Sequence, residues 1–465
     1  MTSQVNLLLS ESQNHSSYPS TLKRVTDFAL ASKPQEMPRE ALQAAAYLFL
    51  DTIGICVAAA PMDAGLIARK TATLLYSPGD QRLSARLLFD GRLVSLAGAI
   101  YAAATQIDNL DGHDGYNPTK GHIGVVTIPT LAAAAENLPD LTGPDALAAL
   151  VIGYEVSGRA AISLHASVND YHTSGAWNAL GVATMLARLR GHSPETLRQA
   201  LGIAEFHGPR SQMMREIANP TMLHDGSGWG ALAGATAAIL AEQGFTGAPA
   251  ITLESDIANP HWSDLGDFWQ VCHQYIKPYP TCRWAHAPVD AARELALAHA
   301  LKAEDVSEVR IRSFNYAVEL YAGHPETTSQ AQYSLPFAVA VMLVHGRIGV
   351  EHISGDGLND PEVARLVDAT KLIADPRHEA RYPLERWADL ELVLADGRVL
   401  TSGDVHARGG PERPYSRQDI VDKYMEFAAP VLGDGRALAL KDAILSLTDE
   451  GSAFADVSKH LYEEV

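Results

Sequence analysis

The sequence predicts a mainly α-helical protein, in which a large all-helical domain carries a smaller α+β lid domain inserted near the C-terminal end. Apolar residues recur at three- and four-residue spacing from about residue 20 to residue 270, which is the period of a packed helix. Beyond that point, runs that alternate apolar and polar residues mix with helical ones, and the final stretch is helical again. The predicted boundaries are residues 20–271 and 411–465 for the helical domain, 272–410 for the lid domain and 1–19 for a flexible tail.

The helical domain is predicted from a series of segments that share the helical period and are rich in Ala and Gly, which permits close helix packing. Ser193 and Pro194 are typical of an N-cap followed by a first-turn proline, and Gly191 before them suits a helix end. The segments are 21–32, 38–60, 95–107, 143–165, 178–191 and 193–207.

The lid domain is predicted from its mixed pattern, which opens with the proline-broken loop KPYPTC and one helix. Residues 306–320 alternate like a strand, and residues 329–346 form a helix with Pro336 in its first turn or at a kink. Residues 390–405 form two strands around an Ala-Asp-Gly turn, which is a hairpin signal. GGPERP at 409–414 resembles a linker, and the helices after it are expected to return to the helical domain.

Length and charge limit the class of protein. At 465 residues the chain is too long for one hydrophobic core, so we expect two or three domains. A content of 47% hydrophobic and 20% charged residues is ordinary for a globular protein. The net charge of −19 argues against a nucleic-acid-binding protein, which needs a basic face.

The three cysteines are too few and too scattered for a disulfide framework, so we expect a reducing compartment, the cytoplasm. No pair has CxxC spacing, and we expect no structural metal site. The first residues lack a basic region and a long apolar run, so they are not expected to be a signal peptide. No eighteen consecutive residues are apolar, and no membrane-spanning helix is expected.

The stretch 108–129, DNLDGHDGYNPTKGHIGVVTIP, concentrates polar groups between two Ala-rich helices. It holds three Asp, two His and one Lys, separated by glycines. A glycine-punctuated polar loop between apolar helices is where a scaffold exposes catalytic groups. The stretch alone leaves a second interpretation open, an Asp-rich surface turn in which Lys120 is only solvated.

Six segments, in order along the chain, resemble the 2-methylcitrate dehydratase superfamily (MmgE/PrpD). They are DNLDGHDGYNPTKGHIGVVTIPTLAA, GYEVSGRAA, YHTSGAWNALGVA, MLHDGSGWGALAGATAAILAEQGFTG, IKPYPTCRWAHAPVDAA and SQAQYSLPFAVA. The superfamily includes 2-methylcitrate dehydratase, cis-aconitate decarboxylase and iminodisuccinate epimerase. The resemblance implies a helical domain built from both ends of the chain, an inserted α+β lid, a homodimer, and catalysis of a small carboxylate substrate with no metal or organic cofactor.

The reactions of this family move a proton at a carbon next to a carboxylate, which needs a base, an acid and cations that hold carboxylates. The resemblance implies four catalytic residues. Asp108 and His122 stand where the family's decarboxylase has an active-site Asp and His, His172 matches a second His, and Lys277 matches an active-site Lys. Structural alternatives remain open: Asp108 as an N-cap, His122 as a helix cap, and His172 as a buried residue bonded to a carbonyl.

Further substrate contacts are expected from His113, Arg210, His224, Arg283, His286 and Tyr321. Two positions depart from the family's pattern. Gly112 stands where the decarboxylase has Thr, so a hydroxyl contact is lost, and His224 stands where relatives carry Lys. Arg210 could replace the lost charge or form salt bridges on a helix, and Tyr321 could bond a carboxylate or only pack.

The resemblance therefore predicts a lyase of the MmgE/PrpD type that acts on a small di- or tricarboxylate, most simply a hydro-lyase like 2-methylcitrate dehydratase. The alternatives are an epimerase of the iminodisuccinate type and a decarboxylase of the cis-aconitate type. A catalytically inactive binding protein is a further alternative from a different class.

Overall fold

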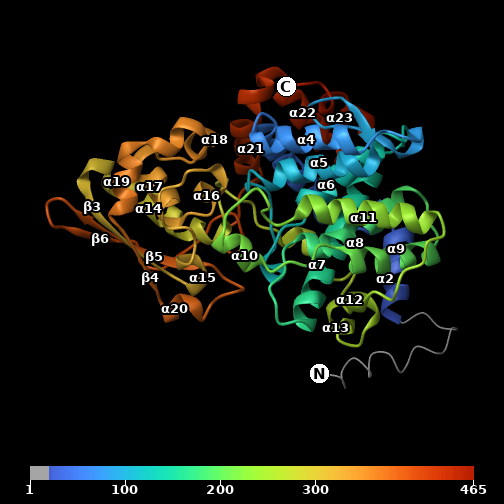
Figure 1. The fold of residues 1–465 in the computed structure, drawn as a ribbon, viewed down its shortest axis with the longest axis horizontal. Helices are drawn as coiled ribbons and strands as arrows, with labels where there is room; N and C mark the ends of the chain where they lie inside the picture. The colour runs from blue at the N-terminus through green and yellow to red at the C-terminus, as the bar shows by residue number, and fades with distance from the viewer. Residues whose placement is uncertain (1–19) are drawn as a thin grey trace.

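The computed structural model describes residues 20–465, and the predicted tail, 1–19, lies outside the described residues. The N-terminal half is helical, as predicted, and its helices stack in one body (Figure 1). The main helices are α2 (Ser20–Ala31), α3 (Arg39–Ala59), α4 (Asp63–Leu75), α5 (Leu96–Asp108), α6 (Gly124–Ala135), α7 (Gly143–Ser167), α8 (Gly175–Leu189), α9 (Pro194–His207), α10 (Met213–Ala218) and α11 (Ser227–Glu242).

Local sequence sets the helix boundaries as expected. The Ser193 side chain accepts a hydrogen bond from the Thr196 backbone and Pro194 opens α9, which confirms the predicted cap. Close packing follows from small residues: a Cβ at Gly181 of α8 would lie 1.9 Å from Ser157 Oγ of α7. The Ala- and Gly-rich composition therefore brings α7, α8 and α11 together.

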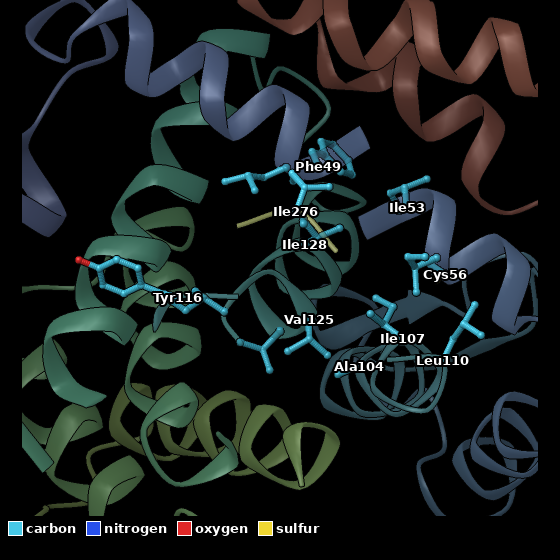
Figure 2. Close-up of a cluster of buried hydrophobic side chains, with 14 of the residues drawn as sticks. Phe49, Ile53, Cys56, Ala104, Ile107, Leu110, Tyr116, Val125, Ile128 and Ile276 are labelled. Atoms are coloured by element: carbon cyan, nitrogen blue, oxygen red, sulfur yellow. The ribbon is translucent and has the colours of Figure 1, made fainter. Parts of the chain in front are cut away.

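The helical core also anchors a segment that comes much later in the chain. Figure 2 draws Ile276 in one cluster of buried hydrophobic side chains with Phe49 and Ile53 of α3 and Ile128 of α6, and all four are buried. Ile276 precedes Lys277, so the lysine backbone is fixed by apolar packing at the residue before it.

A mixed sheet lies to one side of the helical body (Figure 1). Its order is β4-β3-β5-β6, with β3 and β4 parallel and β5 antiparallel to both β3 and β6. The strands are β3 (Val306–Ser313), β4 (Thr370–Ala374), β5 (Trp387–Leu394), β6 (Val399–Thr401) and β7 (Val405–His406). α14 (His286–His299) and α19 (Pro361–Asp368) pack against the sheet, and α17 (Leu335–His345) packs on these two helices.

The hairpin prediction is confirmed, with Leu392 opposite Leu400 and Gly397 at a positive φ in the turn. Two predictions for this region were wrong in detail. The strand expected over 306–320 ends at Ser313, and α15 (Asn315–Val318) follows it. The single helix expected over 329–346 is two, α16 (Thr328–Gln332) and α17, because Ser334 caps α17 with Pro336 in its first turn.

The last helices, α21 (Arg417–Leu432), α22 (Asp434–Leu445) and α23 (Phe454–Leu461), lie against α3 and α6 of the N-terminal half (Figure 1). The buried Lys423 of α21 donates to Asp51 of α3 at 2.5 Å. The predicted return of the C-terminal helices is thus present, while the exact domain boundaries at 271/272 and 410/411 stay predictions.

Two helices, α3 and α7, are long and apolar enough to cross a membrane by length and composition. In the fold, 78% of the most apolar stretch of α3 and 94% of that of α7 are buried. Burial of this kind is expected of core helices.

Candidate active site

The loop between α5 and α6 is buried, so its interpretation as a surface turn was wrong. Asp114 accepts from the Thr52 hydroxyl at 3.1 Å, and Gly115 and Tyr275 exchange two backbone hydrogen bonds of 3.1 and 2.8 Å. From the other side, Lys423 donates to the Gly112 carbonyl at 2.7 Å. The loop is therefore held by α3, by the segment before Lys277 and by the C-terminal helix α21.

A small cavity of about 30 Å³ opens between this loop, the 171–225 region and the segments that lead into the sheet. That is room for roughly two water molecules. Its lining includes Asp111, Lys120, His122, Tyr171, Asp225, Tyr275, Lys277, Cys282, Arg283, Tyr333 and Arg386.

Lys277 is fully buried in this cavity wall and bonds to Asp111. Its ammonium donates to the Asp111 carboxylate and, at 3.0 Å, to the Asp111 carbonyl. Asp111 has a φ of 52°, which is unusual for a residue with a side chain. In this conformation its carbonyl oxygen and one carboxylate oxygen both face the lysine. Burial raises the pKa of Asp111, although the Lys277 ammonium acts in the opposite direction.

His122 is the group best placed to take a proton. Its Nδ1 lies 2.7 Å from the Asp114 carbonyl, which can only accept, so Nδ1 carries the hydrogen and Nε2 has a free lone pair. Nε2 lies 3.6 Å from an Asp225 oxygen at the cavity. Burial, reinforced by the Lys277 charge, lowers the pKa of His122 well below its usual range. The imidazole is therefore neutral at neutral pH.

Asp225 is held by Ser174 at the start of α8. The Ser174 hydroxyl and backbone N–H donate to Asp225 Oδ1 at 3.0 and 3.3 Å, and the same hydroxyl accepts a hydrogen bond from the His122 backbone N–H at 3.1 Å. Burial raises the pKa of Asp225 to about 6. Asp225 thus changes protonation state close to neutrality while its position stays fixed.

Three predicted site residues, Asp108, His113 and His224, are not in the cavity lining but lie next to residues that are. Asp108 accepts from the Ser227 N–H at 3.1 Å, at the N-terminus of α11, and burial followed by the Asp225 charge raises its pKa well above normal. His113 lies 4.0 Å from Asp108, and its ring centroid is 4.6 Å from that of His122. His224 faces the Tyr333 ring at 5.3 Å, and burial lowers its pKa to about 3.

The cavity carries an excess of positive charge within an acidic protein. Four cations line it, Lys120, Lys277, Arg283 and Arg386, against two carboxylates. Arg283 donates to the carbonyls of Ala407 and Arg408 at 3.1 and 2.5 Å, and burial lowers its pKa only to about 10, so it keeps its charge. A buried site with this balance favours an anionic ligand.

Asp111, His113 and His122 place ligand atoms within 4.8 Å of one another, a spacing that could hold a metal ion. The Lys277 ammonium, however, already bonds to the Asp111 carboxylate. A divalent cation would have to displace it and lie beside the positive charge that remained. The donor set therefore fits a proton-transfer site better than a metal centre.

Residues 23–257 match the model of the MmgE/PrpD N-terminal domain, and residues 279–449 match that of the MmgE/PrpD C-terminal domain. The chain belongs to the MmgE/PrpD family. Among its curated relatives, the cis-aconitate decarboxylase of Homo sapiens is 25% identical over 378 residues, 76% of each chain. The cis-aconitate decarboxylase of Aspergillus terreus is 23% identical over 456 residues, 89% of this chain and 90% of the relative. The enzyme of that name in Mus musculus is 25% identical over 361 residues, 72% of each chain.

In this MmgE/PrpD protein, the expected site residues fall into three groups. His122, Lys277 and Arg283 line the cavity, and Asp108, His113 and His224 lie next to those that do. His172, Arg210, His286 and Tyr321 are not in the lining.

The residues outside the lining have structural contacts. Burial, and after it the Arg210 charge, lowers the pKa of His172. His286 is bonded to the Thr281 carbonyl at 3.0 Å, and the Tyr321 hydroxyl donates to the His324 carbonyl at 3.2 Å. The Tyr321 backbone bonds to Tyr333, so Tyr321 supports a cavity residue.

Several lining residues of this MmgE/PrpD protein were not expected as site residues. Asp225 stands in MLHDGSGWG, a segment already singled out. The available signal was a carboxylate directly before two closely spaced glycines. Asp111 and Lys120 lie inside the 108–129 loop, and the sequence gives no reason to prefer them over the other polar residues of that loop. Arg386 precedes β5 with no motif around it, and only the fold brings it to the cavity.

Proposed function

We propose that this protein is a lyase that acts on a small di- or tricarboxylate by moving a proton at the carbon next to a carboxylate. The lyase class rests on membership in the MmgE/PrpD family and on the names of the curated relatives. The observation that carries the chemistry is His122, whose free Nε2 lone pair faces a cavity lined by four cations and two carboxylates.

The charge balance selects the substrate class. Arginine and lysine side chains recognise carboxylates through charge-assisted hydrogen bonds. Asp111 engages Lys277, which leaves Arg283, Arg386 and Lys120 without a carboxylate within 4.0 Å among residues 20–465. A substrate with two or three carboxylates supplies the missing negative charge, and a neutral substrate does not.

Proton transfer follows from the two acid–base groups. In dehydration, the proton on the carbon goes to His122 Nε2, and the electron pair of that C–H bond becomes the C=C bond as the C–O bond to the hydroxyl on the next carbon breaks. The resulting imidazolium lies 3.6 Å from Asp225, which stabilises it. The imidazolium then gives its proton to the departing hydroxyl group, so that water leaves and His122 returns to its neutral form. In decarboxylation the C–C bond breaks, CO₂ leaves, and the electron pair left on the carbon takes a proton that the His122–Asp225 pair has first accepted from the solvent.

Decarboxylation of a cis-aconitate-like tricarboxylate is the first reaction to test, because the relatives described above carry that name. Hydration or dehydration of the 2-methylcitrate type is the second candidate, and Gly112 favours it. A Cβ at Gly112 would lie 2.6 Å from Ile55 Cδ1, so the Thr of the decarboxylase pattern would require the end of the Ile55 side chain to shift. Epimerisation is an outcome of the same experiment.

The proposal includes further expectations from the composition of the chain and from the family resemblance. The protein works as a homodimer in the cytoplasm, without nucleic acid or membrane as partner. It needs no metal and no organic cofactor. Size-exclusion chromatography with light scattering tests the oligomeric state.

The function is tested by incubating the protein with a panel of polycarboxylates in D₂O. Decarboxylation releases CO₂, dehydration yields a conjugated alkene that absorbs in the near ultraviolet, and epimerisation gives deuterium at the α-carbon with loss of optical activity. Absence of all three signals across the panel contradicts the proposal.

Two variants assign the roles. His122→Gln is expected to lower kcat by about 10²–10⁴-fold, the range for a general acid or base. Arg398→Gln, a surface substitution in an exposed ion pair with Asp396, is the matched control. Near-full turnover by the His122 variant would remove it from the mechanism.

A further inference from the structure

Lys120 and Arg386 reach the cavity from different parts of the chain. Lys120 belongs to the buried loop of the helical body, and Arg386 directly precedes β5 of the sheet. Both line the same cavity, and the segments that carry them touch, since the Asn117 side-chain amide donates to the Leu384 carbonyl at 3.0 Å. Two positive side chains thus meet where the helical body and the sheet region join.

Neither cation has a counter-ion. Among residues 20–465, no carboxylate lies within 4.0 Å of the Lys120 ammonium or the Arg386 guanidinium. Arg386 is 2% exposed, donates from one nitrogen to the Pro383 carbonyl, and leaves its buried Nε without a partner. Two nearby positive charges without an anion repel each other and lose hydration, so a bound anion relieves both costs.

The Lys120 backbone conformation and the neighbouring Tyr171 hold the Lys120 side chain at the cavity. Lys120 has a φ of 55°, a conformation that lysine rarely adopts, and Tyr171 fixes it by donating to its carbonyl. The ammonium lies 4.6 Å from the Tyr171 ring centroid, and Tyr171 lines the cavity. A solvated lysine would need none of these constraints.

We infer that Lys120 and Arg386 form a carboxylate subsite for the substrate group farthest from the reacting carbon. The other end of the substrate lies at Lys277 and Arg283, close to His122. The subsite determines specificity for a third carboxylate, and its anion joins the two parts of the chain. This inference rests on the proposed function, because it takes the substrate to be a polycarboxylate.

An inert tricarboxylate separates binding from turnover. Calorimetric titration with tricarballylate and succinate measures the preference for the third carboxylate in the wild type, in Lys120→Met and in Arg386→Gln. Each variant is expected to lose about 10- to 100-fold in tricarballylate affinity, the range for a charge-assisted hydrogen bond, with little change for succinate. Arg381→Gln is the control, since Arg381 lies 3.2 Å from its own carboxylate, Asp404.

Hydrogen exchange adds a structural readout. Tricarballylate is expected to slow amide exchange in residues 382–388 of the wild type and not in Lys120→Met, although that substitution lies in the other part of the chain. A variant that only weakened packing would speed exchange without ligand as well.

The outcomes distinguish the inference from the proposed function. Unchanged tricarballylate affinity and selectivity in both folded variants overturns the subsite. A wild type that binds tricarballylate through these residues but turns over no polycarboxylate keeps the subsite and overturns the lyase. Turnover that depends on His122 but not on Lys120 or Arg386 keeps the lyase and overturns the subsite. A wild type that binds no polycarboxylate overturns both.

Discussion

His122 Nε2 and Asp225 Oδ2 face each other across 3.6 Å at the wall of a small cavity. Each is oriented by other bonds, His122 by the Asp114 carbonyl and Asp225 by Ser174. The Nε2 lone pair and Oδ2 can therefore exchange a proton with each other or with a bound substrate. Their pKa values move in opposite directions for one reason, since burial disfavours both the imidazolium and the carboxylate.

Asp225→Asn is expected to lower kcat by about 100-fold. The amide can keep the bonds from Ser174, but its NH₂ group can donate to His122 Nε2 and so occupy the base. For dehydration by the wild type, kcat/KM is expected to rise as pH increases through about 6, where Asp225 ionises and can stabilise the His122 imidazolium, and this limb is expected to be absent in the variant. A pH–rate profile from pH 4.5 to 8.5 measures both effects, and an unchanged limb near pH 6 contradicts the assignment.

The same substitution is expected to change the pH dependence of stability. The pKa of Asp225 is raised on folding, so the native state binds its proton more tightly than the unfolded chain does. Its contribution to stability is present in full below about pH 4 and is lost as pH rises through about 6. Asp225→Asn should therefore gain stability relative to the wild type, by on the order of 2 kcal/mol, between pH 4 and 7. Urea unfolding at several pH values gives the comparison.

Lys423→Met is expected to destabilise the protein by about 3–5 kcal/mol, because it leaves Asp51 buried without its cation. The double variant Lys423→Met with Asp51→Leu is expected to recover part of the loss, since neither charge then remains buried. Lys459→Met, in an exposed pair with Asp456, is the control and should change little. Chemical denaturation followed by circular dichroism measures all three, and equal effects of the Lys423 and Lys459 variants would contradict the role of Lys423.

Gly112→Ala is expected to cost about 1–3 kcal/mol through overpacking, since its Cβ would lie 2.6 Å from Ile55 Cδ1. Ile55→Val removes that methyl group and should restore most of the stability of the Gly112 variant. Thermal unfolding of the two single variants and the double variant completes the cycle. Additive effects would show that the two residues do not compete for this space.

Removal of metal ions is expected to leave activity unchanged. The Lys277 ammonium bonds to the Asp111 carboxylate that a metal at Asp111, His113 and His122 would need. Dialysis against EDTA, followed by assays with and without added Zn²⁺ and Mg²⁺, measures this. Loss of turnover on chelation with recovery on metal addition would contradict the proton-transfer site.

The helical body could be predicted because each helix carries its own period and caps, as α9 does with Ser193 and Pro194. The strand β3 was predicted too long because residues 315–318 keep the alternating pattern but turn into α15. The spacing of apolar residues indicates which side chains are buried, but it does not indicate where the chain changes direction.

The site was less predictable, because its residues meet only through the fold. Lys277 and His122 stand in recognisable segments, yet nothing local to Arg386 indicates a cavity. His172 stands in a recognisable segment too, but the fold places it outside the lining. Burial also reverses simple charge reasoning: Asp225 titrates near pH 6, whereas a sequence-based reading gives every aspartate the same acidity.

The bond from Lys423 to the Gly112 carbonyl also has a consequence for the point in synthesis at which the site becomes ordered. The loop that carries His122 depends on a side chain made more than three hundred residues later. A ribosome-bound chain that has not yet exposed α21 has its cavity residues but lacks the clamp that orders them. Catalytic competence should therefore arise in one late step of translation, when α21 docks against α3.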